Sequence, residues 1–164
     1  MEMLVVIAIM GTLLSIGIVS ISEYYNRIKL RTATETIAAD IRLARWIAKT
    51  SASTCFITFD TASNTYIVNG TQTQIARLPE GLWFGVDTSV TSRPTQPSSA
   101  PPADGISFDS GTSRNVARFY VSGTVAPTGA VYVTDGKSTM AVTVAITGRP
   151  KIWRSSGGRR WIAL

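Results

Sequence analysis

The chain has 164 residues, of which 45% are hydrophobic, and it contains one Cys and no His. This length and apolar content predict one folded domain. The lack of His excludes Ser-His-Asp and Cys-His catalysis and His-containing zinc sites. No phosphate-binding or calcium-binding loop motif is present, so we expect no catalytic residue, metal, cofactor or small-molecule substrate. The net charge of +6 is typical of a protein that binds nucleic acid or an anionic surface.

The first predicted element is an apolar helix. Residues 3–21 carry no charge, and at about 1.5 Å per residue such a helix comes close to the thickness of a bilayer's hydrocarbon core. A cleaved signal peptide is the alternative, but it starts with basic residues, whereas Glu2 stands here. We therefore expect a membrane-spanning helix, formed by Met3, Leu4, Val5, Val6, Ile7, Ala8, Ile9, Gly11, Leu13, Leu14, Ile16, Ile18 and Ile21.

Glu2 lies at the tip of this apolar segment. A carboxylate is costly to insert into a membrane unless a positive group pairs with it. We expect Glu2 either to find such a partner or to rest in the headgroup region.

The helix is predicted to continue beyond the apolar run. Apolar residues recur every three or four positions from Leu30 to Ala48, and charged residues such as Arg31 and Glu35 lie between them. Tyr24 and Tyr25 precede this stripe, as aromatic residues at a membrane interface do. The prediction is one helix with a membrane-spanning half, residues 1–22, and an amphipathic half, residues 23–50.

Residues 51–164 are predicted to form a globular β domain, because short β-branched and aromatic runs alternate there with turn residues. The expected strands are 55–60, 66–69, 82–86, 116–122, 130–134, 141–147 and 151–154. In the strand 141–147, Val142, Val144 and Ile146 alternate with small or polar residues, so we expect them to face the core. The amphipathic helix is the expected core partner. The fold class is thus α+β, a long N-terminal helix packed on a C-terminal antiparallel sheet.

Two further features of the β domain can be interpreted from the sequence. Cys55 lies in an apolar run and is expected to be a buried structural thiol rather than a reactive one. Residues 88–105 contain Pro94, Pro97, Pro101 and Pro102, which favours an exposed loop over a strand. A loop of this length is typical of functional or disordered segments, and we favour disorder.

The N-terminal string Met1-Glu2-Met3-Leu4-Val5-Val6-Ile7-Ala8-Ile9-Met10-Gly11-Thr12-Leu13-Leu14 resembles the first helix of type IV pilins and pseudopilins. In that family a basic leader ending in Gly precedes a mature start of the form Phe-Thr-Leu-Ile-Glu. Met1 stands at the Ile position, which implies that the true start lies upstream or that the chain has been shortened. The resemblance also implies methylation, and pairing of Glu2 with the N-terminal amine of a neighbouring subunit during filament assembly.

Segments of the β domain resemble the GspH/FimT branch of minor pilins and pseudopilins, namely residues 119–124, 129–134 and 142–151. In that branch a strand, a Gly turn, two more strands and a Gly-Arg close the sheet, as Gly148-Arg149 does here. The resemblance implies a structural subunit anchored once in the bacterial inner membrane, with a periplasmic β domain. Its partners are other pilin or pseudopilin subunits, near the tip of a type II secretion pseudopilus or a type IV pilus. An unrelated membrane-anchored β domain is the other possibility.

The whole excess of positive charge lies after Asp135, in a segment without acidic side chains. In some FimT-like minor pilins a Gly-Arg-x-Arg pattern is associated with DNA binding. Gly148-Arg149-Pro150-Lys151 departs from it, because Lys151 replaces the second Arg and keeps the charge without the planar fork. Trp153 and Trp161 lie among the basic residues and offer faces on which bases stack. Double-stranded DNA is therefore an alternative partner, with Arg149, Lys151, Arg154, Arg159 and Arg160 as candidate contacts. The competing interpretation is a terminal hairpin turning at residues 155–158, with Arg facing solvent and Trp packed.

Overall fold

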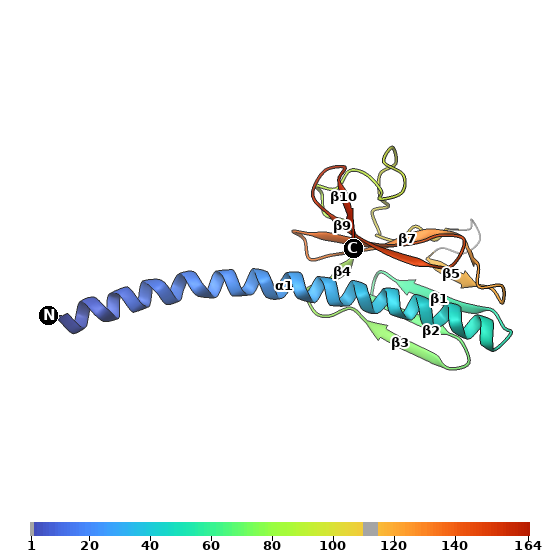
Figure 1. Cartoon of the computed structure of the whole chain (residues 1–164), viewed down its shortest axis with the longest axis horizontal. Helices are drawn as coiled ribbons and strands as arrows, with labels where there is room; N and C mark the ends of the chain where they lie inside the picture. Colours follow the sequence, from blue (N-terminus) through green and yellow to red (C-terminus); the bar gives the residue numbers. More distant parts are fainter. Residues whose placement is uncertain (1, 110–114) are drawn as a thin grey trace.

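The computed structural model describes residues 2–109 and 115–164; within the first 23 residues it describes the side chains of Met3, Val6 and Met10. A single helix, α1, runs from Glu2–Thr50 and projects far beyond the β domain, which packs against the C-terminal half of the helix (Figure 1). The predicted fold class, a long N-terminal helix packed on an antiparallel β domain, is confirmed.

Burial of one stripe explains why the second half of α1 packs as it does. The side chains facing the β domain are at most 6% exposed, and they recur at the helical spacing that the sequence shows: Leu30, Ala33, Ile37, Ile41, Ala44 and Ala48. Alanines in this stripe let the strands approach the helix closely. The helix ends where the Ser51 N–H and hydroxyl both donate to the Ile47 carbonyl, at 2.9 and 2.6 Å.

Within the described residues the β domain contains two five-stranded sheets, where we expected one. The first has the order β3-β2-β1-β5-β6, with β1 Cys55–Asp60, β2 Thr65–Asn69, β3 Thr73–Arg77, β5 Val116–Phe119 and β6 Val125–Ala126. The second has the order β10-β9-β8-β7-β4, with β4 Trp83–Phe84, β7 Gly129–Thr134, β8 Thr139–Val144, β9 Pro150–Ser155 and β10 Trp161–Ala163. Neighbouring strands in both sheets are antiparallel.

Aromatic side chains fill the space where the two sheets meet. The Phe59 ring on β1 lies 5.8 Å from the Phe84 ring on β4, edge to face, and is stacked on the Phe108 ring at 5.9 Å. Phe108 is fully buried, as is Cys55 at the start of β1. The core is therefore continuous from the helix stripe through β1 to the second sheet.

Three of the expected strands end earlier than their composition indicated. The strand expected at 82–86 ends at Phe84. After Phe119 the chain turns, and Gly123 N–H donates to the Tyr120 carbonyl at 2.7 Å; after Val144, Gly148 N–H donates to the Ala145 carbonyl at 2.8 Å. Ile146 consequently lies in a turn and is 66% exposed, so its predicted core position is wrong.

The outer face of β8 is also not the solvent-facing surface that alternation predicts. Ala141 is fully buried and Thr143 is 8% exposed, because Trp153, Trp161 and the 88–105 segment cover them. Alternation along one strand identifies two faces, but it does not show whether another part of the chain covers the second.

The Pro-rich segment 88–105 has a defined path, which contradicts the disorder favoured from its composition. Its backbone binds the turn before β10: Thr91 N–H donates to the Gly158 carbonyl at 3.0 Å, and Gly158 N–H donates to the Ser89 carbonyl at 2.9 Å. Val90 and Ser92 are buried. At the far end of the segment, the Gly105 carbonyl accepts the Tyr132 N–H of β7 at 2.7 Å. The loop is therefore a covering layer of the second sheet.

Candidate functional site

The projecting half of α1 makes the first candidate surface. Met3, Val6 and Met10 are more than half exposed, and Leu30 is the first buried side chain among those described in the helix. At about 1.5 Å per residue, the helix extends roughly 40 Å before it reaches the β domain (Figure 1). In the described part of the chain, no helix has both the length and the hydropathy that a membrane span needs.

The predicted assembly and membrane-spanning residues belong to this projecting half, and their roles stay predictions. Met3 and Val6 are exposed. The other side chains named for these roles lie outside the described ones: Glu2, Leu4, Val5, Ile7, Ala8, Ile9, Gly11, Leu13, Leu14, Ile16, Ile18 and Ile21.

Polar bonds along the second half of α1 fix it to the β domain. The Lys29 ammonium donates to the Glu80 carbonyl, and the buried Tyr66 hydroxyl donates to the Asp40 carboxylate. Burial, together with that carboxylate, raises the pKa of Tyr66, so the phenol stays a donor at neutral pH. Helix and domain are thus joined by directed contacts as well as by apolar packing.

Near its end, α1 also holds two turns of the β domain together. Arg45 Nε donates to the Gly123 carbonyl at 2.9 Å. A Cβ added at Gly148 would lie 2.5 Å from that same carbonyl oxygen and 2.9 Å from Arg45 Cδ. The Gly of the Gly148-Arg149 pair is therefore required by the close approach of these turns to the helix.

The candidate DNA-binding residues do not share one face. Successive residues of a strand point to opposite sides of the sheet, so Lys151 and Arg154 on β9 face opposite ways. Lys151 lies on the outer face, with Nζ 4.4 Å from the centre of the Trp153 ring, whereas Arg154 is paired in register with Met140 on the helix side. Arg149 follows the Gly148 turn, and Arg159 and Arg160 lie in the turn before β10; all three are exposed.

The two tryptophans of this region are used in packing. Trp153 Nε1 donates to Thr143 Oγ1 at 2.9 Å, and Trp161 Nε1 donates to the Ser92 carbonyl at 2.8 Å. The Trp161 ring meets the Tyr132 ring edge-on at 6.0 Å. Both tryptophans thus lie on the covered outer face, which Lys151 shares, whereas Arg149, Arg159 and Arg160 lie in exposed turns.

A third surface brings together basic residues that are far apart in the sequence. A groove of about 550 Å³ runs between α1 and the end of the second sheet, and it is lined by Tyr24, Arg27, Ile28, Leu30, Arg31, Ser138, Met140, Arg154, Ser155, Ser156 and Leu164. Arg31 Nε donates to Glu35 Oε1 at 2.7 Å. Within the described chain, the side chains of Arg27 and Arg154 have no hydrogen bond or ion pair.

Side chains suited to chemistry are not gathered into a site in the part of the chain that the structure describes. Residues 2–109 and 115–164 contain no group of three or more Cys, Asp and Glu placed to hold a metal. Burial raises the pKa of the Cys55 thiol, which disfavours the nucleophilic thiolate. Burial also raises the pKa of Tyr132 to about 12, although the positive charge of Arg93 lowers it in part.

Comparisons with known proteins give one likeness to report. No protein-family model and no curated protein matches the chain. Among solved structures, the chain is similar to the minor pseudopilin EpsH from the type 2 secretion system of Vibrio cholerae, with a TM-score of 0.48 and 12% identity. The match covers 83% of this chain and 96% of that chain. At this identity and TM-score, it adds nothing to the fold class that the structure itself displays.

Sequence reasoning missed the groove because its arginines come from separate elements. Arg27 and Arg31 stand one helical turn apart directly after the apolar run, which is a visible signal. Arg154 joins them only because β9 lies beside the helix, and no sequence spacing indicates that neighbour. The spacing of Arg27 and Arg31 could therefore have identified the helix side of the groove, but not the strand side.

Proposed function

We propose that the chain is a structural subunit of a pilus-like filament, a minor pilin or pseudopilin, held in the bacterial inner membrane by α1 before it assembles near the filament tip. The observation that supports this most is the projecting half of α1, which carries no charge from residue 3 to residue 22 and lies outside the β domain. An apolar surface of this size is unstable in water and has to be covered by lipid or by other helices.

A filament subunit uses both coverings in turn. Lipid surrounds the apolar half before assembly, and the helices of neighbouring subunits replace it in the filament. Glu2 then pairs with a positive group of the next subunit, which removes the unfavourable free energy of a lone carboxylate in an apolar environment. The filament is a type II secretion pseudopilus or a type IV pilus, since both place the same demands on the helix.

Replacing Glu2 with Ala is expected to separate membrane insertion from assembly. In cells that make the filament, the variant should stay in the membrane fraction after an alkaline carbonate wash, while its amount in sheared filaments falls on the order of ten-fold. Glu23→Ala, at the other end of the apolar segment, is the matched control and should assemble normally. If the wild-type chain is washed off the membrane, or if Glu2→Ala assembles as well as the control, this proposal fails.

Double-stranded DNA is a second candidate partner, favoured by the exposure of Arg149, Lys151, Arg159 and Arg160 in a segment without acidic side chains. These residues are suited to contact phosphates without reading bases. Arg154 is directed towards the helix, so we expect it to contribute less than the turn arginines.

Measured by fluorescence anisotropy with the full chain in uncharged detergent, such binding should weaken steeply as salt rises. Arg159→Ala with Arg160→Ala should lower the slope of log K against log salt by about two, since each phosphate contact contributes about 0.9. Arg42→Ala with Arg77→Ala, which removes the same charge from other exposed positions, should leave the slope unchanged. No binding at low salt would exclude DNA as a partner.

A further inference from the structure

The groove between α1 and β9 has the charge of an anion site. Arg27 and Arg31 come from one face of the helix, and Arg154 comes from the neighbouring strand. Glu35 partly neutralises Arg31, but both side chains of that pair are about half exposed or more, where an ion pair contributes little. Arg27 and Arg154 have no such partner within the described chain. The groove therefore keeps positive charge available.

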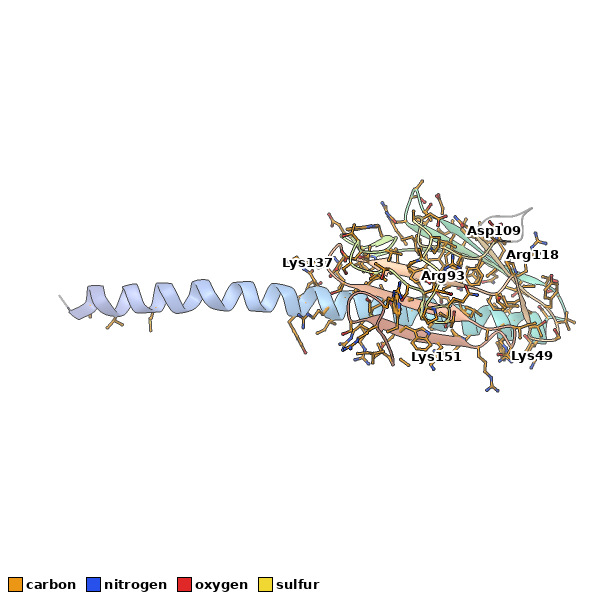
Figure 2. The ribbon with its side chains drawn as sticks, turned by 90° about the horizontal axis from the view of Figure 1, so that it is seen from above. Lys49, Arg93, Asp109, Arg118, Lys137 and Lys151 are labelled. Atoms are coloured by element: carbon orange, nitrogen blue, oxygen red, sulfur yellow. The ribbon has the colours of Figure 1, made fainter. Side chains whose placement is uncertain are left out.

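The other charged groups near the groove do not reverse this sign. Leu164 lines one wall, and its N–H donates to the Ile152 carbonyl at 3.1 Å. Asp135 lies in the turn beside Ser138, where its carboxylate accepts the N–H groups of Lys137 and Ser138 at 2.9 and 2.7 Å. Lys137 lies at the same end of the domain, where the helix leaves it (Figure 2).

The remaining lining is suited to more than a bare anion. Leu30 and Met140 form an apolar floor, and Ile28 and Tyr24 extend it along the helix towards the apolar half. Ser138 and Ser156 also line the groove and bring hydroxyl groups to it. The groove thus offers cations and hydroxyls next to a strip of apolar surface, which complements a molecule with a charged head and an apolar body.

The position of the groove along α1 indicates that such a molecule comes from the membrane rather than from solution. Arg27 comes five residues after Ser22, where the uncharged run ends, so it stands about 8 Å further along the helix axis. If residues 3–22 lie in the hydrocarbon core, this places the groove among the lipid headgroups, and Tyr24 beside it occupies the usual depth of interfacial aromatic residues.

We propose that this groove binds an anionic phospholipid, with Arg27 and Arg154 on its phosphate and with Ile28, Leu30 and Met140 against its glycerol and upper acyl carbons. Guanidinium groups match the oxygens of a phosphodiester in geometry as well as charge. The inference rests on the proposed membrane anchoring. The bound lipid holds the β domain against the membrane surface and fixes the tilt of α1, and it has to be released when the subunit enters the filament.

Lipid retention in native mass spectrometry tests this directly. The full chain in uncharged detergent is mixed with equal amounts of phosphatidylglycerol and phosphatidylcholine that carry identical acyl chains. We expect the wild type to retain the anionic lipid on the order of ten-fold more than the zwitterionic one, since both arginines distinguish a net negative headgroup. Arg27→Gln with Arg154→Gln should bring that ratio close to one.

A matched variant separates the groove from general charge attraction. Arg42→Gln with Arg77→Gln removes the same charge from exposed positions outside the groove and should keep the wild-type preference. A wild-type ratio of one, or an equal loss in both double variants, would overturn the site. Displacement of the lipid by millimolar inorganic phosphate would assign the groove to free phosphate instead.

Separate controls test whether the variants fold and whether the chain is anchored in the membrane. Arg27 and Arg154 are exposed, so we expect the double variant to keep the circular dichroism and the unfolding midpoint of the wild type. If the double variant were unstable, Arg154→Gln alone would give the same decision. Failure of membrane anchoring appears as loss of the wild-type chain from the membrane fraction, whereas failure of the lipid site leaves the anchored chain without lipid preference.

Discussion

Replacing Gly105 with Ala is expected to lower the free energy of unfolding by about 2–5 kcal/mol. Gly105 has a φ of +74°, in the left-handed region that side chains disfavour. The added Cβ would also overlap the backbone nitrogen of Gly85, and it would lie 2.7 Å from the Gly85 Cα and 2.9 Å from the Phe84 carbonyl carbon. These are backbone atoms of and beside β4, so relief requires the loop to leave the sheet and to release the Tyr132 N–H that the Gly105 carbonyl accepts.

Gly157→Ala is the control that separates backbone strain from overlap. Gly157 has a φ of +87°, but no atom lies within 4 Å of an added Cβ there. It should lose only the strain, about 1–2 kcal/mol. Urea unfolding of the full chain in detergent, followed by tryptophan fluorescence, measures both variants. Equal losses would show that the Pro-rich segment does not press on β4 as described.

Truncating Ile41 to Ala is expected to lower the free energy of unfolding by about 2–5 kcal/mol, through lost apolar burial and the cavity left behind. Ile41 is fully buried in the middle of the helix stripe. The strands are tied to each other by ladder hydrogen bonds and cannot close in on the gap, so the cavity should largely remain.

Ile28→Ala gives the same chemical change on the same helix at a 45% exposed position. It should lower the free energy of unfolding by less than about 1 kcal/mol. The same urea series compares the two. If Ile41→Ala were as mild as Ile28→Ala, the second half of α1 would not be a core element of the domain.

The helix could be predicted well because its signals are local. The stripe from Leu30 to Ala48 lies at helical spacing, and residues 18–69 contain no Gly or Pro that would interrupt a helix there. The ends of the strands could not be predicted in this way, because they are set by turns that tertiary contacts stabilise. Gly123 and Gly148 close tight turns next to Arg45, and residues that read as strand by composition are used up in those turns.

The covering of the second sheet was beyond sequence reasoning for a different reason. Ser92 and Trp161 are 69 positions apart, yet their hydrogen bond joins the Pro-rich segment to the last strand. Composition describes the solvation of an isolated segment and contains no information on a partner of this kind. Likewise, the charge after Asp135 appeared as one patch, whereas strand geometry sends Lys151 and Arg154 to opposite sides.

Because α1 is one continuous helix, the rotation of the β domain about the helix axis is fixed relative to the projecting half. The helix runs from residue 2 to residue 50 and has no Gly or Pro between Ser22 and Lys29. Its second half is bonded to the β domain through Lys29, Asp40 and Arg45. Rotation of the first half about the helix axis therefore rotates the β domain with it. One residue inserted between them would rotate the β domain by about 100° around the helix axis and advance it by about 1.5 Å. The orientation of the β domain about the projecting half of α1 is therefore set by the number of residues in this segment.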